Sequence, residues 1–329
     1  MGSLILVTIQ VNDEADSNWN KRLIDSEIGT INQTIERGIN FQRNGQTPHF
    51  LYFLDNNGNI VGQLLYSTSS RLEKKGITNR FLKKLPGIEK TVYFWIYGPI
   101  IFVPEFYNQI HSSFAQFLKS KNGKIFGTTS PLLINKESIL KQNYYVKEWG
   151  TYLIDLTKSK DELYNNINKH SGRKNIERSI KRGVKIEEIT EENLKDYLVV
   201  RNQFKESMGE TPMDFQQALA WWKLMKPLGY TGFLARKEGK PIGGLLFSYF
   251  NKVIVEAGVA RSKEDFSENL YSQDLIKWKI IQWGVENNMK YYDLAGYNPH
   301  PENEKEKGIK KYKAKWGGEN RTYWIIRGN

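Results

Sequence analysis

Apolar residues along the first half of the chain recur at the spacings of amphipathic helices and of strands. Residues 19–37 and 106–121 carry apolar side chains near helical spacing and predict two helices. Between them, residues 49–69 form two apolar runs around the polar turn DNNGN, which indicates a hairpin. Residues 91–103 predict a strand that is interrupted at Gly98–Pro99, because proline cannot donate a hydrogen bond to a central strand pair.

The second half of the chain repeats this order. Helices are predicted over 170–182 and 191–208, and a hairpin with a third strand over 230–261. A helix with an apolar face follows over 270–288, and a strand over 290–299.

The two hairpins also resemble each other in sequence. FLDNNGNIVGQLLYS and FLARKEGKPIGGLLFS both place a polar, glycine-containing turn between apolar runs. A single repeat at a separation of about 180 residues indicates a duplicated domain rather than a solenoid. We therefore expect an α/β (α+β) fold with two domains, residues 1–150 and 151–329, that share a cleft.

Composition excludes several classes of protein. With 39% hydrophobic residues, the chain can bury real cores. No apolar run approaches the roughly 20 residues that span a bilayer, and the opening residues lack the basic region and cleavage site of a signal peptide. The absence of cysteine excludes disulfides and thiolate nucleophiles. We expect a cytoplasmic monomer without membrane insertion.

The net charge of +12 predicts an anionic partner, such as a phosphate-bearing molecule, nucleic acid or a lipid headgroup. Basic residues exceed acidic ones in both halves, so the excess does not belong to an appended tail. One basic run is 169–185, with seven Lys or Arg residues against one Glu. It is either a phosphate or RNA contact or a solvated helix face, and the sequence leaves both open.

Several motifs, in this order along the chain, carry a family resemblance. YGPIIF and FGTTSP lie in the first half, and the basic helix and YYDLAGYNP lie in the second. The segment Tyr312-Lys313-Ala314-Lys315-Trp316-Gly317 closes the series. Together these motifs resemble the Fem family of peptidoglycan-bridge aminoacyltransferases and their Fem-like relatives, in a compact form. The resemblance implies two GNAT-like acyltransferase domains with mixed central sheets.

The residues are compatible with direct attack of an amine on an acyl donor. No nucleophile elbow is present, and the four histidines show no metal-ligand spacing, so we expect neither a covalent intermediate nor a metal. The resemblance selects Lys313 as the catalytic cation that stabilises the developing oxyanion. On a strand, Lys311, Lys313 and Lys315 would share one face, and the alternative is a solvated strand edge.

Further candidates for substrate binding come from the same resemblance and from their positions. Arg201 is expected beside the acceptor pocket, with a surface ion pair as the alternative. Tyr97 is expected to line a cleft between the domains, or to pack in a core. Asp293 is either a proton acceptor or a turn cap. The candidate substrate-binding residues are Arg201, Tyr97, Gly98, Lys310, Tyr312 and Asp293.

The acyl donor is a co-substrate, and no bound cofactor is expected. CoA-dependent GNAT enzymes carry a glycine-rich loop before the helix that receives the pyrophosphate. Here the corresponding segment is ARSKEDFSENLYSQDL, which contains no glycine. This favours aminoacyl-tRNA as donor and an amine on a phosphate-bearing acceptor, such as a peptidoglycan precursor. An acyl-CoA-dependent N-acyltransferase and a non-catalytic duplicate that binds an anionic ligand or RNA remain the alternatives.

Overall fold

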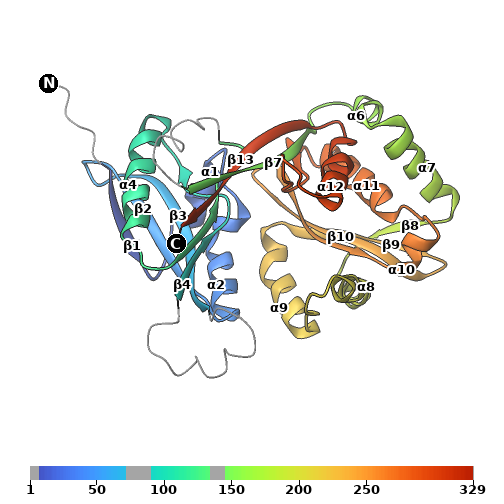
Figure 1. The fold of residues 1–329 in the computed structure, drawn as a ribbon, viewed down its shortest axis with the longest axis horizontal. Helices are drawn as coiled ribbons and strands as arrows, with labels where there is room; N and C mark the ends of the chain where they lie inside the picture. Colours follow the sequence, from blue (N-terminus) through green and yellow to red (C-terminus); the bar gives the residue numbers. More distant parts are fainter. Residues whose placement is uncertain (1–6, 72–89, 134–144, 329) are drawn as a thin grey trace. The chain divides into compact units, whose positions relative to one another are not determined.

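A computed structural model describes residues 7–71, 90–133 and 145–328 of the chain. The chain divides into two compact units, one made of Met1–Trp149 with Thr322–Asn329 and the other of Gly150–Arg321. The segment 322–329 was expected in the second domain. It belongs to the first unit, because its strand pairs with a strand of that unit (Figure 1).

The first unit is built on a mixed sheet. Its strand order is β1-β2-β3-β4-β6-β13, and among the described strands each neighbouring pair is antiparallel except β4 with β6, which is parallel. Its elements are β1 (Thr8–Asn12), α1 (Trp19–Asp25), η1 (Ile31–Gln33), α2 (Ile35–Arg43), β2 (Thr47–Leu54), β3 (Ile60–Arg71), β4 (Lys90–Trp95), β5 (Ile100–Ile101), η2 (Pro104–Phe106), α4 (Tyr107–Lys119), β6 (Lys124–Thr128) and the C-terminal part of β13 (Glu319–Gly328).

The second unit repeats the arrangement of strands. Its strand order is β7-β12-β11-β10-β9-β8, again with one parallel pair, β11 with β12. Its elements are β7 (Tyr145–Asp155, from Gly150), α6 (Lys160–Asn166), η3 (Lys169–Arg173), α7 (Lys174–Lys181), β8 (Lys185–Glu188), α8 (Leu194–Ser207), α9 (Phe215–Met225), η4 (Lys226–Leu228), β9 (Tyr230–Lys237), β10 (Lys240–Phe250), β11 (Val253–Arg261), α10 (Lys263–Ser267), α11 (Ser272–Glu286), β12 (Tyr291–Asp293) and α12 (Glu304–Ala314).

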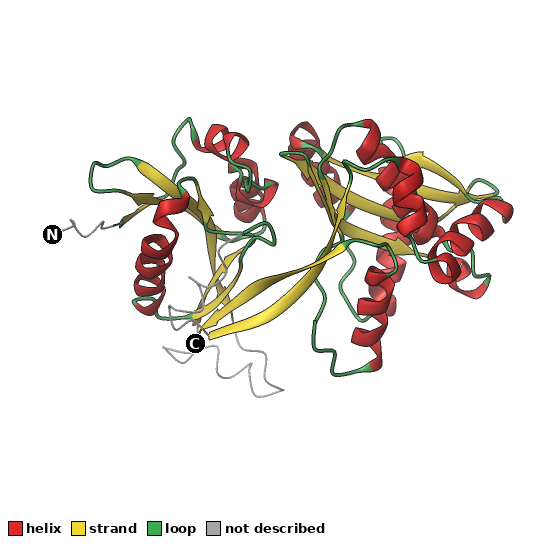
Figure 2. Ribbon diagram, turned by 90° about the horizontal axis from the view of Figure 1, so that it is seen from above, coloured by secondary structure: helices red, strands yellow, loops and turns green. Residues whose placement is uncertain are grey.

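The predicted pair of hairpins is confirmed, down to a shared irregularity. In β2–β3, Phe53 pairs with Gly62 and Leu54 with Ile60, so one residue is skipped. In β9–β10, the register likewise shifts between Pro241 and Gly243. In both units, helices lie on both sides of the strands (Figure 2). The same sequence of pairings in both units is what a duplicated domain predicts.

Two predicted elements were wrong. The helix expected over 19–37 is interrupted, because the Thr34 side chain caps a new helix by accepting from the Arg37 amide. The strand expected around Lys313 is the last turn of α12 instead. That helix begins where Asn303 accepts from the Glu306 amide, and its residues are mostly Glu and Lys, which favour helix.

Each unit has its own hydrophobic core. The core of the first unit includes Trp95 and Phe114, and that of the second includes Phe247, Ile280 and Trp316. Within the described residues, no helix is long and apolar enough to cross a bilayer.

Candidate active site

The second unit has a place where its two parallel strands separate. β11 and β12 pair only from Val253 with Tyr291 to Val255 with Asp293, while β11 continues along β10. Two residues after Val255, Ala257 is an extra residue between the partners of Leu246 and Phe247. Such a bulge bends the strand and changes the direction of neighbouring side chains.

A buried carboxylate lies at this separation. Glu256 forms an ion pair with Lys277 of α11, and both side chains are less than one-tenth exposed. The hydroxyl of Tyr292 donates to Glu256 Oε1 over 2.7 Å. Burial, with the nearby carboxylate, raises the pKa of Tyr292 well above its usual value, so this hydroxyl keeps its proton. The carboxylate is therefore neutralised and held by two donors.

Lys313 reaches the same region from α12. Its Nζ donates to three backbone carbonyls, those of Leu294 at 2.7 Å, Ala295 at 2.9 Å and Gly296 at 2.8 Å. An ammonium has three N–H donors, so all of them are in use. Burial lowers the pKa of Lys313 from 10.5 to about 8, an effect that the charge of Glu256 opposes.

The turn that Lys313 holds is also fixed by Asp293. The Asp293 carboxylate is buried and accepts from the Thr151 hydroxyl at 2.5 Å and from the Ala295 amide at 2.9 Å. Ala295 has a positive φ of 59°, which a non-glycine residue adopts only where its surroundings enforce it. Asp293 thus fits the turn-capping interpretation, and its contacts leave the role of proton acceptor a prediction.

Tyr312 and Lys315 extend this group of polar side chains along α11. The group is called the polar cluster below, and its members are Glu256, Lys277, Tyr292, Asp293, Lys313, Tyr312, Lys315 and Asp274. Lys315 forms a buried ion pair with Asp274, and its Nζ lies 4.1 Å from the centre of the Tyr312 ring. The Tyr312 hydroxyl is buried and has no hydrogen-bond partner among the described residues. Burial and the carboxylates Asp274 and Glu256 raise the pKa of Tyr312 well above its usual value. An orphaned, protonated hydroxyl here is a donor available to a ligand.

The first turn of α11 is already occupied by an acidic side chain of the chain itself. Asp265 Oδ1 accepts from the Ser272 amide at 2.9 Å, and its other oxygen accepts from Arg261 Nε at 2.5 Å. Asp265 is fully buried, and Asp274 adds a second carboxylate in the same turn. A helix N-terminus favours anions, and here internal carboxylates take that place.

The corresponding position in the first unit is apolar. Its parallel strands β4 and β6 pair from Val92 with Lys124 to Trp95 with Gly127. A Cβ at Gly127 would lie 1.9 Å from the Trp95 ring, so the indole fills the space over β6. The Trp95 indole also packs edge-on against Phe114 of α4, at 5.3 Å between ring centres. The polar cluster therefore belongs to the second unit.

The structure brings together some of the predicted site residues. Lys313, Tyr312 and Asp293 belong to this cluster, and Lys310 lies one turn earlier on α12, where its Nζ donates to the Pro299 carbonyl at 2.9 Å. Arg201 does not join them, because its helix α8 covers the opposite face of the sheet.

Two adjacent glycines in β10 show that α8 and α11 cover opposite faces of the sheet. A Cβ at Gly243 would meet Ser272 of α11, whereas one at Gly244 would meet Tyr197 of α8. Adjacent strand residues point to opposite faces. Arg201 interacts with the Tyr197 hydroxyl on the α8 face.

Tyr97 and Gly98 lie in the first unit. Tyr97 is buried, with a φ of 53°, and its ring lies 5.9 Å from that of Tyr323. A Cβ at Gly98 would lie 2.4 Å from Leu64, so close packing requires glycine there. Both residues fit the packing interpretation, and lining a shared cleft stays a prediction.

Sequence reasoning missed Glu256, Lys277, Asp274, Lys315 and Asp265. A usable signal was present for three of them: Glu256 is the only charge in the apolar run VIVEAGVA, and Asp274 and Lys277 interrupt the apolar face of LYSQDLIKWKII. Charged side chains are rarely buried in a core unless they are paired, so charges within apolar runs indicate buried ion pairs. Within the described residues, no group of three His, Asp or Glu side chains could hold a metal ion.

Comparison with solved structures identifies the fold. FemX superposes with a TM-score of 0.70 at 13% sequence identity, over 96% of this chain and 97% of FemX. The C-terminal domain of a putative lysylphosphatidylglycerol synthetase from Agrobacterium fabrum gives 0.58 at 14% identity, over 94% and 91% of the two chains. A tandem GNAT protein from the clavulanic acid biosynthesis pathway gives 0.52 at 10% identity, over 98% and 99%. The predicted tandem GNAT-like fold, of the kind seen in FemX, is thus confirmed.

In sequence, no protein-family model and no curated protein matches the chain.

Proposed function

We propose that the protein is an acyltransferase that joins an activated acyl group to an amine. The observation that carries the proposal is Lys313, a desolvated cation beside the separating ends of β11 and β12, in a chain with the fold of FemX. Electrostatic stabilisation of a developing oxyanion needs a fixed positive group in a place from which water is excluded.

The reaction needs no covalent enzyme intermediate. The acceptor amine attacks the ester carbonyl of the donor, a C–N bond forms, and the carbonyl oxygen becomes an oxyanion. The C–O ester bond then breaks, and the leaving hydroxyl carries away the proton that the amine has lost. The oxyanion is a stronger acceptor than a peptide carbonyl, so it displaces one of the three carbonyls from Lys313 Nζ.

For the donor we propose aminoacyl-tRNA rather than acyl-CoA. At the start of α11 the Ser272 amide already donates to Asp265, so it is not available to a pyrophosphate. Basic side chains of α7 are exposed to solvent, among them Lys174, Arg178 and Lys181. Contacts to tRNA phosphates need cations at loose spacing, which this helix supplies.

For the acceptor we propose an amine on a phosphate-bearing molecule of the peptidoglycan-precursor type, and we place the reaction in the cytoplasm, where charged tRNA is made. The net charge of +12 supports an anionic acceptor. Arg201 remains the predicted phosphate ligand, on the α8 face of the sheet.

The test supplies aminoacyl-tRNA and acyl-CoA separately to the pure protein with a panel of amines. We expect amide formation from charged tRNA, abolished by prior RNase treatment. Transfer from acyl-CoA alone would overturn the donor assignment but keep the acyltransferase. Salt-sensitive RNA binding without transfer from either donor would instead identify a non-catalytic binding protein.

A further inference from the structure

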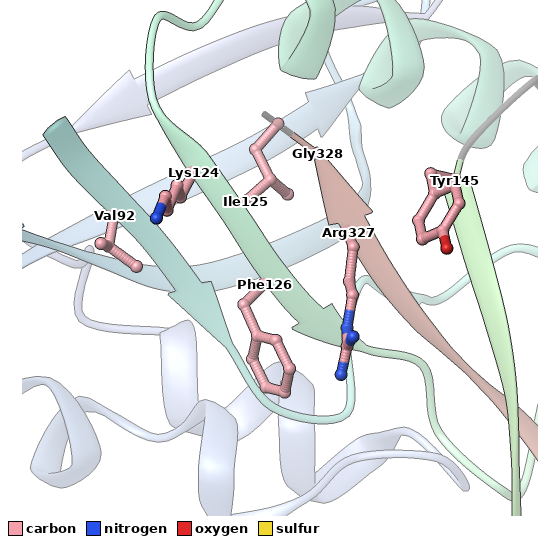
Figure 3. A pocket seen from close by; sticks show the side chains of 7 residues that line it. All are labelled: Val92, Lys124, Ile125, Phe126, Tyr145, Arg327 and Gly328. Carbon is pink, nitrogen blue, oxygen red and sulfur yellow. The ribbon is translucent and has the colours of Figure 1, made fainter. Parts of the chain in front are cut away.

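One sheet face of the first unit carries a row of side chains over β4, β6 and β13. Val92 pairs with Lys124, and Phe126 pairs with Arg327, so each pair shares a face. Lys124 and Phe126 are two residues apart on one strand and therefore also lie on that face. Figure 3 shows Phe126 and Arg327 side by side on neighbouring strands.

The two faces of this part of the sheet are covered differently. Helix α4 covers the far face through Phe114, which packs against Trp95. On the near face, Phe41 of α2 packs edge-on against Phe94, at 6.1 Å between ring centres. Beyond Phe94 the face is hollowed into a groove of about 660 Å³. Its lining residues are Val92, Lys124, Ile125, Phe126, Tyr145, Arg327 and Gly328.

The chemistry of this groove is cationic and aromatic. Among the described residues that line it, two are cations, Lys124 and Arg327, and none is a carboxylate. Phe126 stacks on Phe94 at 5.9 Å and 10°, which fixes the plane of its ring. The Arg327 guanidinium lies 5.7 Å from the centre of that ring. A guanidinium is the side chain best suited to hold a phosphate through two parallel hydrogen bonds.

We propose that this groove binds a phosphate ester carried on a flat ring, the chemistry that nucleotides share with aryl phosphates. Arg327 takes the phosphate, and the ring lies against Phe126 and the exposed Tyr145. The groove has the size of known small-molecule sites, about 300–1,000 Å³. This binding does not depend on acyl transfer, so either can fail without the other.

Isothermal titration of the full chain tests the proposal with phenyl phosphate, UMP, AMP, uridine and inorganic phosphate as probes. Phenyl phosphate and at least one nucleotide bind, and inorganic phosphate and uridine bind at least tenfold more weakly. A preference for UMP or for AMP shows whether the groove favours a pyrimidine or a purine ring. Arg327→Gln weakens the binding of phenyl phosphate by about 10- to 100-fold, because a charged hydrogen bond is lost.

Lys21→Gln is the matched control, because Lys21 is an exposed cation of the same unit, paired with Asp25. It leaves affinity unchanged. Equal binding of inorganic phosphate and phenyl phosphate would overturn the proposal, since no ring would then be recognised. So would unchanged affinity in Arg327→Gln, or an equal loss in Lys21→Gln, because binding would then lie elsewhere or follow net charge. Absence of binding at millimolar concentration would also overturn it.

Discussion

Replacing Lys313 by methionine removes the proposed catalytic cation and keeps much of its length. Loss of one donor to an oxyanion lowers turnover by about 10²–10³-fold, so we expect this decrease for Lys313→Met with the assigned donor. Lys307→Met is the matched control, because Lys307 lies on the same helix in an exposed ion pair with Glu304. We expect it to keep the wild-type rate.

The stability of the variant follows from two opposing effects. The pKa of Lys313 is lowered from 10.5 to about 8, which corresponds to about 3 kcal/mol of destabilisation of the charged form in the native state. Between about pH 8 and pH 10.5 this lysine carries a proton in the unfolded chain that it lacks in the folded chain. The stability that this group contributes is therefore present above pH 10.5 and is lost as pH falls through about 8.

At pH 7, Lys313→Met removes that cost but also removes three hydrogen bonds to carbonyls. The two effects offset each other, and we expect the free energy of unfolding to change by less than about 3 kcal/mol.

The assay is the initial rate of amide formation between pH 6 and 10, with urea unfolding of each variant in parallel. Because the charged lysine is the active form, the wild-type rate falls as pH rises through about 8. Lys313→Arg keeps its charge in this range and so loses that decline. A wild-type rate in folded Lys313→Met would refute the reasoning, as would an unchanged decline in Lys313→Arg.

Three further changes test the structure. Lys277→Met leaves Glu256 buried without its cation, and we expect chemical denaturation to show a loss of about 3–5 kcal/mol in the free energy of unfolding. The double variant Lys277→Met with Glu256→Gln recovers much of this loss. Additive losses from the two substitutions would contradict a coupled pair. Gly127→Ala places a methyl group inside the Trp95 ring and costs about 3 kcal/mol or more, and an unchanged thermal midpoint would disprove the close packing. Asn303→Ala removes the cap of α12 and costs about 1 kcal/mol, and no loss would argue against the cap.

The hairpins could be predicted from sequence because their turns and apolar runs are local signals. Helix α12 could not, since its lysines alternate with apolar residues in a way that suits a strand equally well. These residues form a helix rather than a strand because Asn303 caps its start and two glutamates in its first turn favour the helix N-terminus. All three lie upstream of the segment 312–317. The closing strand joined the first unit through pairing with β6, a contact between distant segments that has no local signal.

The candidate site could be predicted only in part. The family resemblance pointed to Lys313, but its contacts depend on a turn at 294–296 that no pattern specifies. The position of Arg201 depends on which face of the sheet α8 covers, and the contacts at Gly243 and Gly244 place α8 on the face opposite α11. The Glu256–Lys277 pair forms across two elements, so only the isolated charges were visible.

The most direct test of acyl transfer in the second unit is mass-spectrometric detection of the amide product from aminoacyl-tRNA carrying an isotope-labelled amino acid. The account predicts labelled amide on an amine acceptor with wild-type protein and Lys307→Met, and at least a hundredfold less with Lys313→Met. Equal labelled product from wild type and Lys313→Met, or none from wild type with any acceptor, would contradict it.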